Sequence, residues 1–299
     1  MRLRVFISLA IGLATGLCCW SFLRHFQLRA GDFNWPVWAA QDLLAHRNPY
    51  DRVMQMYPLP AAFYGLPFVR LPLEVAAGVF YGLSSALMAF GLSRQGYHRL
   101  LVFLAYPYWA GLMAAQWSPI IFASAFFPFL LPVTLAKPQL GLPVALTNPT
   151  KRGFIACFVV LALSFLLLPR WPWLWLAKLH DYVHFFPLLI LPGPLLALAL
   201  LRYRERDALL LFLMALMPQR WFYDPLILWL IPKTRREILG TVAASWAIGV
   251  WRFHHYPQGH VQAGRWMVVF FYLPMLAVVL ARPRVAEPCA DPTRAATSD

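Results

Sequence analysis

Long apolar runs are the feature that most constrains this chain. Residues 5–23 and 73–92 are mostly apolar, and each approaches the roughly 20 residues that a helix needs to cross a bilayer. The 299-residue chain is 61% hydrophobic and only 13% charged, whereas soluble domains carry roughly 25% charged residues. The first run is too long for a signal-peptide core and lacks a clean cleavage site. The sequence therefore predicts an all-α, polytopic membrane protein with about eight to ten membrane helices.

Some of these expected membrane helices are broken. The region 120–147 contains Pro128, Pro132 and Pro138, which predicts a broken or re-entrant element. Residues 206–233 are divided by a polar stretch over 218–224, which predicts two short helices that meet at a polar tip. The other expected spans are 5–23, 73–92, 100–115, 154–168, 185–201, 239–251 and 266–281.

The basic residues predict how the chain lies in the membrane. The net charge is +14, and in a polytopic protein Arg and Lys collect on the cytoplasmic side, where they meet anionic lipid. We therefore expect membrane lipids, and no nucleic acid, as partners. With Arg2 and Arg4 inside, residues 24–72 form a long first outer loop. Residues 1–282 then make one membrane domain, and 283–299 form a disordered cytoplasmic tail.

The first outer loop contains a polar stretch over 29–58. Asp32 follows Gly31 a few residues beyond the first span. A carboxylate there is placed for general-base chemistry on a lipid-linked substrate, or it simply caps the next helix. Residues 35–44 are typical of a short interfacial helix, with Pro36 in its first turn and Asp42 on its polar face.

Five arginines lie in or beside this loop, and two interpretations of them stay open. They either anchor the loop to anionic headgroups or grip the phosphate of a lipid-phosphate donor, for which the guanidinium fork is suited. The five are Arg24, Arg29, Arg47, Arg52 and Arg70.

Two groups of histidines resemble metal-binding patterns. His180 and His184 stand one helical turn apart around Asp181, which occupies the position of Glu in zinc hydrolases, but no third ligand is evident nearby. An interfacial helix with exposed histidines explains this pattern better. A second group, His254, His255 and His260, shares another outer loop. We expect no resident metal and no cofactor, although a divalent metal that assists stays open. The four cysteines show no metal spacing.

The order of several short motifs resembles a known family. Gly31-Asp32-Phe33, a short Ala- and Leu-rich helix ending in Asn48-Pro49-Tyr50-Asp51, and Tyr57-Pro58 before the next span are similar to one group of bacterial enzymes. These are the polyprenyl-phosphate-mannose-dependent alpha-mannosyltransferases, glycosyltransferase family eighty-seven, within the class C membrane architecture.

Further motifs follow in the same order. Gln116-Trp117-Ser118 resembles the family's Gly-Gln-x-Asn turn, and Lys137-Pro138-Gln139 matches its Lys-Pro-Gln. Pro218, Trp221 and Tyr223 resemble its Ser-Pro-x-Ser-Trp-x-His segment. The chain departs from the family pattern at Ala115, Met217 and Arg220, and its interval from 116 to 137 is shorter than usual.

The resemblance implies an inverting hexosyltransferase in the bacterial inner membrane. It would move mannose or a similar sugar from a polyprenyl-phosphate donor to a hydroxyl of a glycan, lipid or protein acceptor on the outer face. The matching residues imply Asp32 as general base and a phosphate clamp made by Arg29, Lys137 and Arg220. Substrate contacts are expected from Asn48, Tyr50, Asp51, Tyr57, Gln116, Gln139, Trp221 and Tyr223.

A non-catalytic protein is the alternative. A lipid-carrier transporter or an assembly subunit would keep the same membrane scaffold without the chemistry. Broken spans and polar residues within the membrane suit transporters as well, and the shortened interval from 116 to 137 favours this alternative. The order and identity of the outer-loop motifs favour the enzyme.

Overall fold

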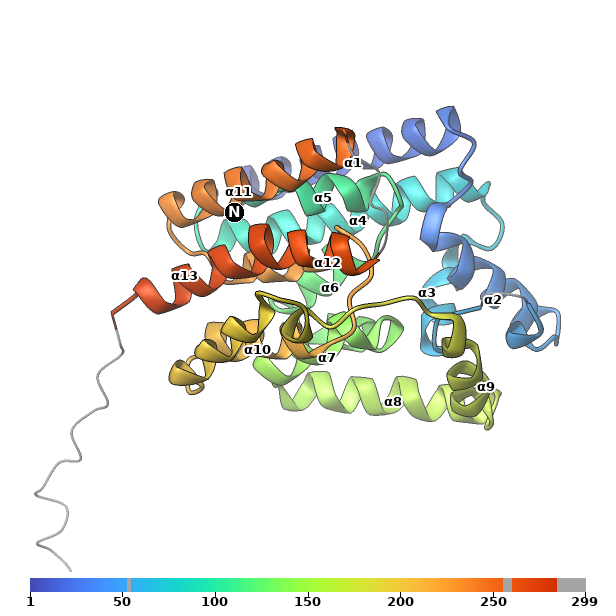
Figure 1. Ribbon diagram of the computed structural model, residues 1–299. Helices are drawn as coiled ribbons and strands as arrows, with labels where there is room; N and C mark the ends of the chain where they lie inside the picture. Colours follow the sequence, from blue (N-terminus) through green and yellow to red (C-terminus); the bar gives the residue numbers. More distant parts are fainter. Residues whose placement is uncertain (53–54, 255–259, 284–299) are drawn as a thin grey trace, which may run out of the picture.

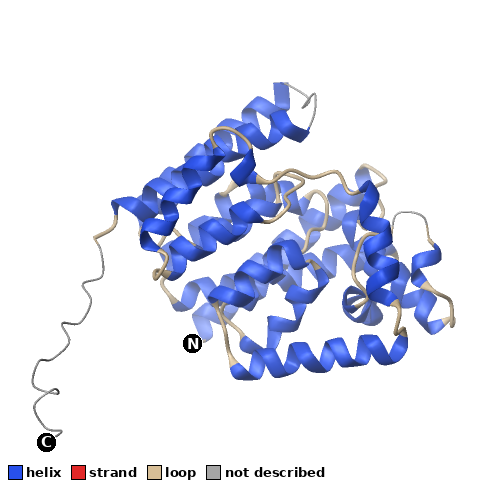
Figure 2. Cartoon of the chain, turned by 60° about the horizontal axis from the view of Figure 1, so that its bottom comes forward, coloured by secondary structure: helices blue, strands red, loops and turns tan. Residues whose placement is uncertain are grey.

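The protein is all-helical, as the apolar sequence predicts. The structure is a computed structural model that describes residues 1–52, 55–254 and 260–283. Helices account for 77% of the structure, and the described residues contain no β-strand. Figure 2 shows helices throughout the described chain, joined by loops. A helix satisfies its backbone hydrogen bonds internally, which apolar surroundings require.

The described elements are α-helices and short 3-10 helices (η), with η10 a π-helix. In chain order they are α1 (Arg2–His25), η1 (Gly31–Phe33), α2 (Asn34–Leu44), η2 (Pro49–Asp51), α3 (Pro60–Gly65), η3 (Leu66–Phe68), α4 (Leu73–Arg94), η4 (Tyr97–Leu104), α5 (Tyr106–Leu112), α6 (Ser118–Ser124), η5 (Pro128–Ala136), α7 (Pro138–Thr147), α8 (Lys151–Leu167), α9 (Trp171–Lys178), η6 (Leu179–Asp181), η7 (Pro187–Leu189), η8 (Gly193–Arg202), α10 (Arg206–Leu216), η9 (Asp224–Leu230), α11 (Arg235–His254), α12 (His260–Met267), η10 (Val268–Tyr272) and α13 (Leu273–Ala281).

Three described helices are long and apolar enough to cross a membrane. They are Arg2–His25, Leu73–Arg94 and Val261–Ala281, and α8 with α9 becomes a fourth if this pair, bent by 92°, counts as one span. This is fewer than the eight to ten membrane helices expected. The expected span over 100–115 is divided at Ala105 between η4 and α5, and the one over 185–201 forms the 3-10 helices η7 and η8 instead of an α-helix.

The predicted broken elements are confirmed. Residues 118–147 form α6, η5 and α7, with Pro128 beginning η5 and Pro138 beginning α7. Residues 206–230 form α10 and η9, which are separated by the stretch that contains Pro218. Proline ends or bends a helix because it lacks an N–H group and clashes with the preceding turn. These breaks bring polar side chains into the interior of the bundle.

Helices α1 and α4 pack closely along their length. Gly12 of α1 faces Gly82 of α4, and a Cβ atom on Gly12 would lie 2.7 Å from the Gly82 carbonyl oxygen. Small residues at such crossings let two backbones approach each other. The other face of α1 exposes apolar side chains, which suits contact with lipid: Leu3, Phe6, Leu9, Leu13 and Leu17.

The bundle has two distinct ends. In Figure 1, α2, α3 and α9 gather at one end, whereas the N-terminus and the last turn of α13 lie at the other. The long helices α1, α4 and α8 run between these ends (Figure 1). The first loop therefore forms one end of the molecule, next to the broken elements.

A short helix forms where the sequence predicts one in the first loop: it is α2, with Pro36 in its first turn. The expectation that Asp42 lies on a polar face is wrong, because this residue is only 3% exposed. Its carboxylate accepts hydrogen bonds from Arg47 (Nη2–Oδ1 2.8 Å) and from Arg52 (Nη2–Oδ1 3.0 Å). Burial alone would raise the pKa of Asp42, but the hydrogen bonds from both arginines outweigh burial and lower this pKa. Two loop arginines are thus bound within the loop.

Candidate functional site

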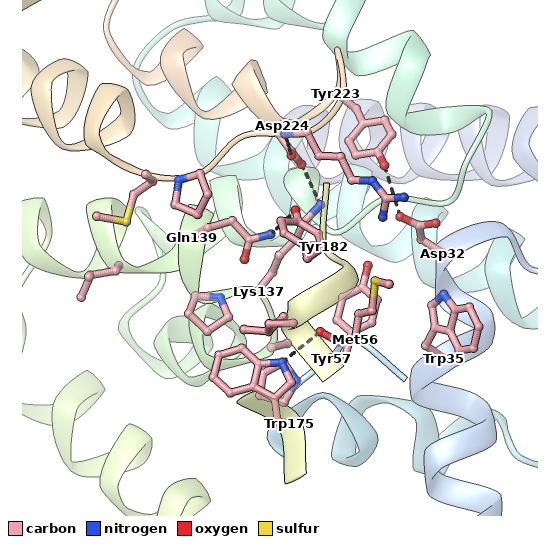
Figure 3. Close-up of a pocket in the computed structure, with 18 residues that line it drawn as sticks. Asp32, Trp35, Met56, Tyr57, Lys137, Gln139, Trp175, Tyr182, Tyr223 and Asp224 are labelled. Atoms are coloured by element: carbon pink, nitrogen blue, oxygen red, sulfur yellow. Dashed lines mark hydrogen bonds and ion pairs between the residues drawn. The ribbon is translucent and has the colours of Figure 1, made fainter. Parts of the chain in front are cut away.

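Side chains from five separate segments line one cavity of about 290 Å³ (Figure 3). Part of its wall is apolar and part is polar, which is usual for a small-molecule site. Its apolar lining includes Trp35, Met56, Leu142, Trp175, Leu179 and Met217. Its polar lining consists of Asp32, Tyr57, Lys137, Gln139, Tyr182, Arg220, Tyr223 and Asp224.

A tight backbone contact positions Asp32. The preceding Gly31 has φ +54°, and a Cβ atom there would lie 2.6 Å from the Ala114 carbonyl oxygen. Only glycine fits this conformation and this close approach. The Asp32 N–H donates to the Ala114 oxygen (2.9 Å), and the ring of Phe33 stacks on Phe80 with centroids 4.0 Å apart. Asp32 is therefore held against the turn between α5 and α6.

Gln116 lies behind the cavity wall and connects two of its charged residues. It is fully buried, its Nε2 donates to Asp32 Oδ2, and its Oε1 accepts from Lys137 Nζ (3.0 Å). Because a lysine only donates, the amide oxygen must face Lys137 and the NH₂ group must face Asp32. The preceding Ala115 has φ +48°. This conformation is easier for glycine, the residue that the resembled family has there.

Lys137 and Asp224 form a buried ion pair. Lys137 immediately precedes α7, and Asp224 begins η9, so both lie where an apolar segment is broken. The Nζ–Oδ1 distance is 2.7 Å, and the two side chains are 7% and 0% exposed. Removing both charges from water costs free energy, and only close geometry and further hydrogen bonds offset this cost.

Tyr223 donates a second hydrogen bond to Asp32. The distance from its hydroxyl oxygen to Asp32 Oδ2 is 3.3 Å. Burial, and then the negative charges of Asp32 and Asp224, raise the pKa of Tyr223 well above its usual value. The hydroxyl therefore stays protonated and acts as a donor. In Figure 3 the hydroxyl of this side chain points toward the neighbouring Asp32 carboxylate.

Arg220 is held mainly by aromatic rings. Its Cζ lies 5.4 Å from the centroid of Tyr182 and 5.9 Å from that of Trp221, within the range of cation–π attraction. An isolated β-bridge between Phe185 and Gln219 brings the two chain segments together. Within the described chain, its buried Nε has no hydrogen-bond partner. A buried charged donor without a partner is suited to bind an anion from the cavity.

The arrangement provides a base and a cation in one cavity. Both donors to Asp32, Gln116 and Tyr223, bind Oδ2. In the described part of the chain Oδ1 accepts no hydrogen bond. That oxygen can take a proton from a hydroxyl group, while Arg220 can stabilise negative charge that develops nearby.

Most of the residues predicted from the sequence meet at this cavity. Six line it: Asp32, Tyr57, Lys137, Gln139, Arg220 and Tyr223. Two more contact these residues from behind, Gln116 through hydrogen bonds and Trp221 through the guanidinium of Arg220.

Four predicted residues lie elsewhere. Arg29 is exposed in the turn before η1. Asn48 caps η2, where its Oδ1 accepts from the Tyr50 N–H (3.1 Å) and its Nδ2 donates to Asp51 (2.9 Å). The buried Tyr50 hydroxyl donates to the Tyr57 carbonyl (3.2 Å). Arg29 thus does not line this cavity. The other three shape the loop instead of lining the site, because their polar groups bind one another and the loop backbone.

Sequence reasoning missed several lining residues, Asp224 above all. The signal for Asp224 was available, because an acid inside a largely apolar stretch usually has a functional or paired role. Tyr182 offered no such signal, because only the bridge between Phe185 and Gln219 brings its segment to Arg220. Trp35 and Trp175 also line the cavity.

The histidine patterns do not form a metal site in the described chain. The 3-10 helix η6 ends at Asp181, and Tyr182 is extended, so His180 and His184 are not one α-helical turn apart. Among the described residues, no three His, Cys, Asp or Glu side chains are grouped to hold a metal ion. The side chains of His254, His255 and His260, and Cys289, lie outside the described part. Cys18, Cys19 and Cys157 are free.

The likeness to a known family rests on the short motifs alone. No family model matches the sequence, and no curated protein or solved structure matches the chain. What the cavity does must therefore be inferred from its chemistry.

Proposed function

We propose that this protein is a membrane glycosyltransferase that transfers a sugar from a polyprenyl phosphate to an acceptor hydroxyl. One observation carries the proposal: Asp32, Lys137 and Arg220, from three remote segments, line the same cavity. Transfer from a phosphate donor needs a base for the acceptor and a cation for the leaving group. Both are present in the cavity.

The reaction requires one proton transfer and one displacement. Asp32 Oδ1 takes the proton of the acceptor hydroxyl, whose oxygen forms a bond to C1 of the sugar. The bond between C1 and the phosphate oxygen breaks, and its electron pair stays on the phosphate, which leaves as polyprenyl phosphate. Attack from the face opposite the leaving group inverts the anomeric carbon. The guanidinium of Arg220 stabilises the charge of the leaving phosphate.

The lining of the cavity suits an amphiphilic donor. Met56, Leu142 and Leu179 provide an apolar wall for isoprenoid carbon, next to the charged groups. Trp35 and Trp175 offer aromatic faces of the kind that pack against sugar rings. We infer that the transferred sugar is mannose or a similar hexose, and that the acceptor is a glycan, lipid or protein.

We infer that the protein is polytopic and lies in the bacterial inner membrane, and the distribution of charge supports one orientation for it. Basic residues cluster at the end of the bundle opposite α2 and α9, near the starts of α10 and α11 and the end of α13 (Figure 1). This arrangement favours a cytoplasmic location for that end. The first loop and the cavity then lie toward the outer face. The basic residues are Arg202, Arg204, Arg206, Lys233, Arg235, Arg236 and Arg282.

The direct test is incubation of the purified protein with a panel of polyprenyl-phosphate sugars and candidate acceptors. Mass spectrometry of the lipids is expected to show that one donor is consumed and that polyprenyl phosphate is released. If no donor is consumed, the catalytic proposal is wrong. If the protein instead moves lipid phosphate across vesicle membranes, the transporter alternative is correct.

A further inference from the structure

Asp224 takes no part in the reaction above, yet it is a fully buried charge in the cavity wall. Its side chain is 0% exposed, and its Oδ1 lies 2.7 Å from Lys137 Nζ. Its Oδ2 accepts a hydrogen bond from the backbone N–H of Arg220 (3.3 Å). A buried carboxylate with two such partners connects the start of η9 to two cationic residues of the site.

A chain of hydrogen bonds leads from Asp224 to Asp32. Asp224 Oδ1 accepts from Lys137, Lys137 also donates to Gln116 Oε1 (3.0 Å), and Gln116 Nε2 donates to Asp32 Oδ2. The four side chains come from η9, the residue before α7, the turn after α5, and η1. No two of them are close in sequence. The chain therefore sets the orientation of the Asp32 carboxylate from remote parts of the fold.

The donors of Lys137 are already committed. A lysine ammonium has three N–H groups. One is directed to Asp224 and one to Gln116, and Nζ also lies 4.9 Å from the ring centroid of Tyr223, where cation–π attraction operates. Asp224 moreover neutralises its charge. Little remains of Lys137 to bind a phosphate, whereas the Nε of Arg220 has no partner among the described residues.

We propose that Asp224 is a positioning residue: it holds Lys137, and through Gln116 the base Asp32, and so withdraws Lys137 from phosphate binding. This inference rests on the proposed function. It leaves Arg220 as the cavity cation that recognises the phosphate group of the donor. The same Asp224 also anchors the backbone of Arg220, so that one buried acid orients both halves of the site.

Binding of farnesyl phosphate to the purified full chain, measured by calorimetry, tests whether Arg220 and not Lys137 recognises the phosphate. This measurement does not require catalysis. Arg220→Met is expected to weaken binding at least about tenfold, because a charge-assisted contact is lost. The charge-neutral double variant Lys137→Gln/Asp224→Asn is expected to weaken it less than about threefold. A double variant that loses as much affinity as Arg220→Met would overturn the inference.

Two controls keep this comparison clear. Lys137→Met/Asp224→Leu replaces the pair by apolar side chains, a change that buried ion pairs often tolerate, and it serves if the amide pair does not fold. Asp207→Asn makes the same acid-to-amide change at the other end of the molecule, away from the cavity. It is expected to leave farnesyl phosphate binding unchanged.

The positioning role is tested by the pH dependence of kcat. Asp224→Asn leaves the charge of Lys137 uncompensated, which stabilises the ionised base, so the acid limb of the profile is expected to move to lower pH and kcat to fall. The KM for the donor is expected to change little, and Asp224→Glu to restore the position of the limb. A residue that only supports the fold would leave the limb in place, and that result would refute the positioning role.

The two proposals can fail separately. If the variants show the expected order of farnesyl phosphate affinities while the wild-type protein transfers no sugar, the proposed function is wrong. In that case the assignment of phosphate binding to Arg220 stands. If sugar is transferred but the double variant loses phosphate affinity as Arg220→Met does, the function stands and this inference falls.

Discussion

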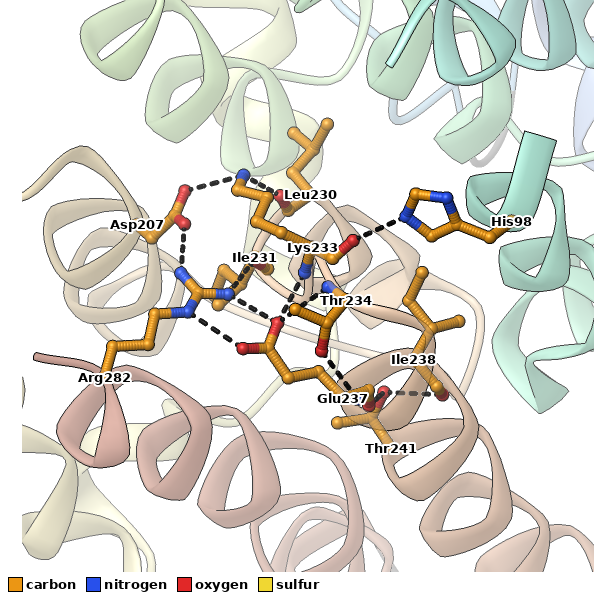
Figure 4. A network of polar contacts seen from close by, with 10 residues as sticks. All are labelled: His98, Asp207, Leu230, Ile231, Lys233, Thr234, Glu237, Ile238, Thr241 and Arg282. Carbon is orange, nitrogen blue, oxygen red and sulfur yellow. Dashed lines mark hydrogen bonds and ion pairs between the residues drawn. The ribbon is translucent and has the colours of Figure 1, made fainter. Parts of the chain in front are cut away.

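The cavity and the polar network at the other end of the bundle use the same kinds of charged side chains in different ways. That network, here called the Arg282 network, consists of Asp207, Lys233, Glu237 and Arg282 (Figure 4). Arg282 donates to Asp207 (2.7 Å) and to Glu237 (2.8 Å), and Lys233 donates to the other Asp207 oxygen (3.0 Å). These contacts connect α10, the loop before α11, α11 and the end of α13.

The two regions differ in how many of their polar atoms have a hydrogen-bond partner. In the Arg282 network all four carboxylate oxygens of Asp207 and Glu237 accept hydrogen bonds. In the cavity, the buried Arg220 Nε has no partner within the described residues, and the hydrogen bonds that Gln116 and Tyr223 donate to Asp32 both go to Oδ2, not Oδ1. Buried polar groups are normally paired, so a saturated cluster is suited to hold helices together, whereas unpaired groups around a cavity indicate a place for a ligand.

Arg99 departs from this pattern. It is 1% exposed, and its three guanidinium nitrogens have no hydrogen-bond partner in the described chain. It does not line the cavity. Burial lowers the pKa of Arg99 to about 10, and the nearby negative charges of Asp207 and Glu237 oppose this shift only in part. Arg99 therefore lies within the electrostatic reach of the Arg282 network.

The largest effect is expected from Asp32→Asn. Loss of a general base lowers kcat by about 10²–10⁴-fold, and the amide keeps the size of the side chain, so the thermal midpoint should stay close to that of the wild type. Initial rates of sugar transfer check this expectation. Asp51→Asn is the matched control, since Asp51 is exposed and lies outside the cavity. Wild-type rates for the Asp32 variant would remove the catalytic assignment.

Asp207→Asn is expected to do the opposite: it should lower stability and leave activity unchanged. It weakens two ion pairs in the Arg282 network and should lower the free energy of unfolding by about 1–2 kcal/mol, a figure reduced for the exposure of Lys233. Unfolding in a denaturing detergent measures the change. Transfer kinetics per folded molecule should stay as in the wild type. A shifted kcat–pH profile would show that the two ends are coupled, and so would contradict the comparison.

The pH dependence of stability should report on Glu237. Burial alone would raise its pKa, but hydrogen bonds from Arg282 and from the N–H groups of Lys233 and Thr234 outweigh burial and bring the pKa to about 2. Because the pKa is lowered in the folded state, the contribution to stability is present above about pH 4.5 and is lost as the pH falls toward about 2. Thermal midpoints measured across this window should fall less steeply in Glu237→Gln. Equal slopes in both proteins would count against this assignment.

Arg47→Ala is expected to have the smallest effect. The Arg47 side chain is 64% exposed and shares Asp42 with Arg52, so its loss should cost no more than about 1 kcal/mol. The affinity for farnesyl phosphate should not change, because Arg47 is engaged with Asp42 and does not line the cavity. A marked loss of affinity would restore the interpretation that the loop arginines grip the donor phosphate.

Local patterns in the sequence predicted single elements well and their environment poorly. The prolines over 120–147 predicted a break, and the structure has one. Helix α2 was also predicted, but the side of it that faces inward was not, because two arginines draw Asp42 into the interior. Fewer long apolar helices form than hydropathy predicted, since hydropathy does not reveal that 185–201 forms 3-10 turns.

Composition and spacing by themselves determined that the chain is helical and apolar, where it breaks, and that Lys137 and Arg220 stand at those breaks while Asp32 stands in the first loop. Only the tertiary structure decided which of these residues meet, that Lys137 is bound to Asp224, and that Arg29 and Asp51 lie apart from them. The physical reason is that a local pattern governs the backbone within a few residues. Pairing between buried charges instead depends on distances between remote segments, which packing of the whole bundle sets.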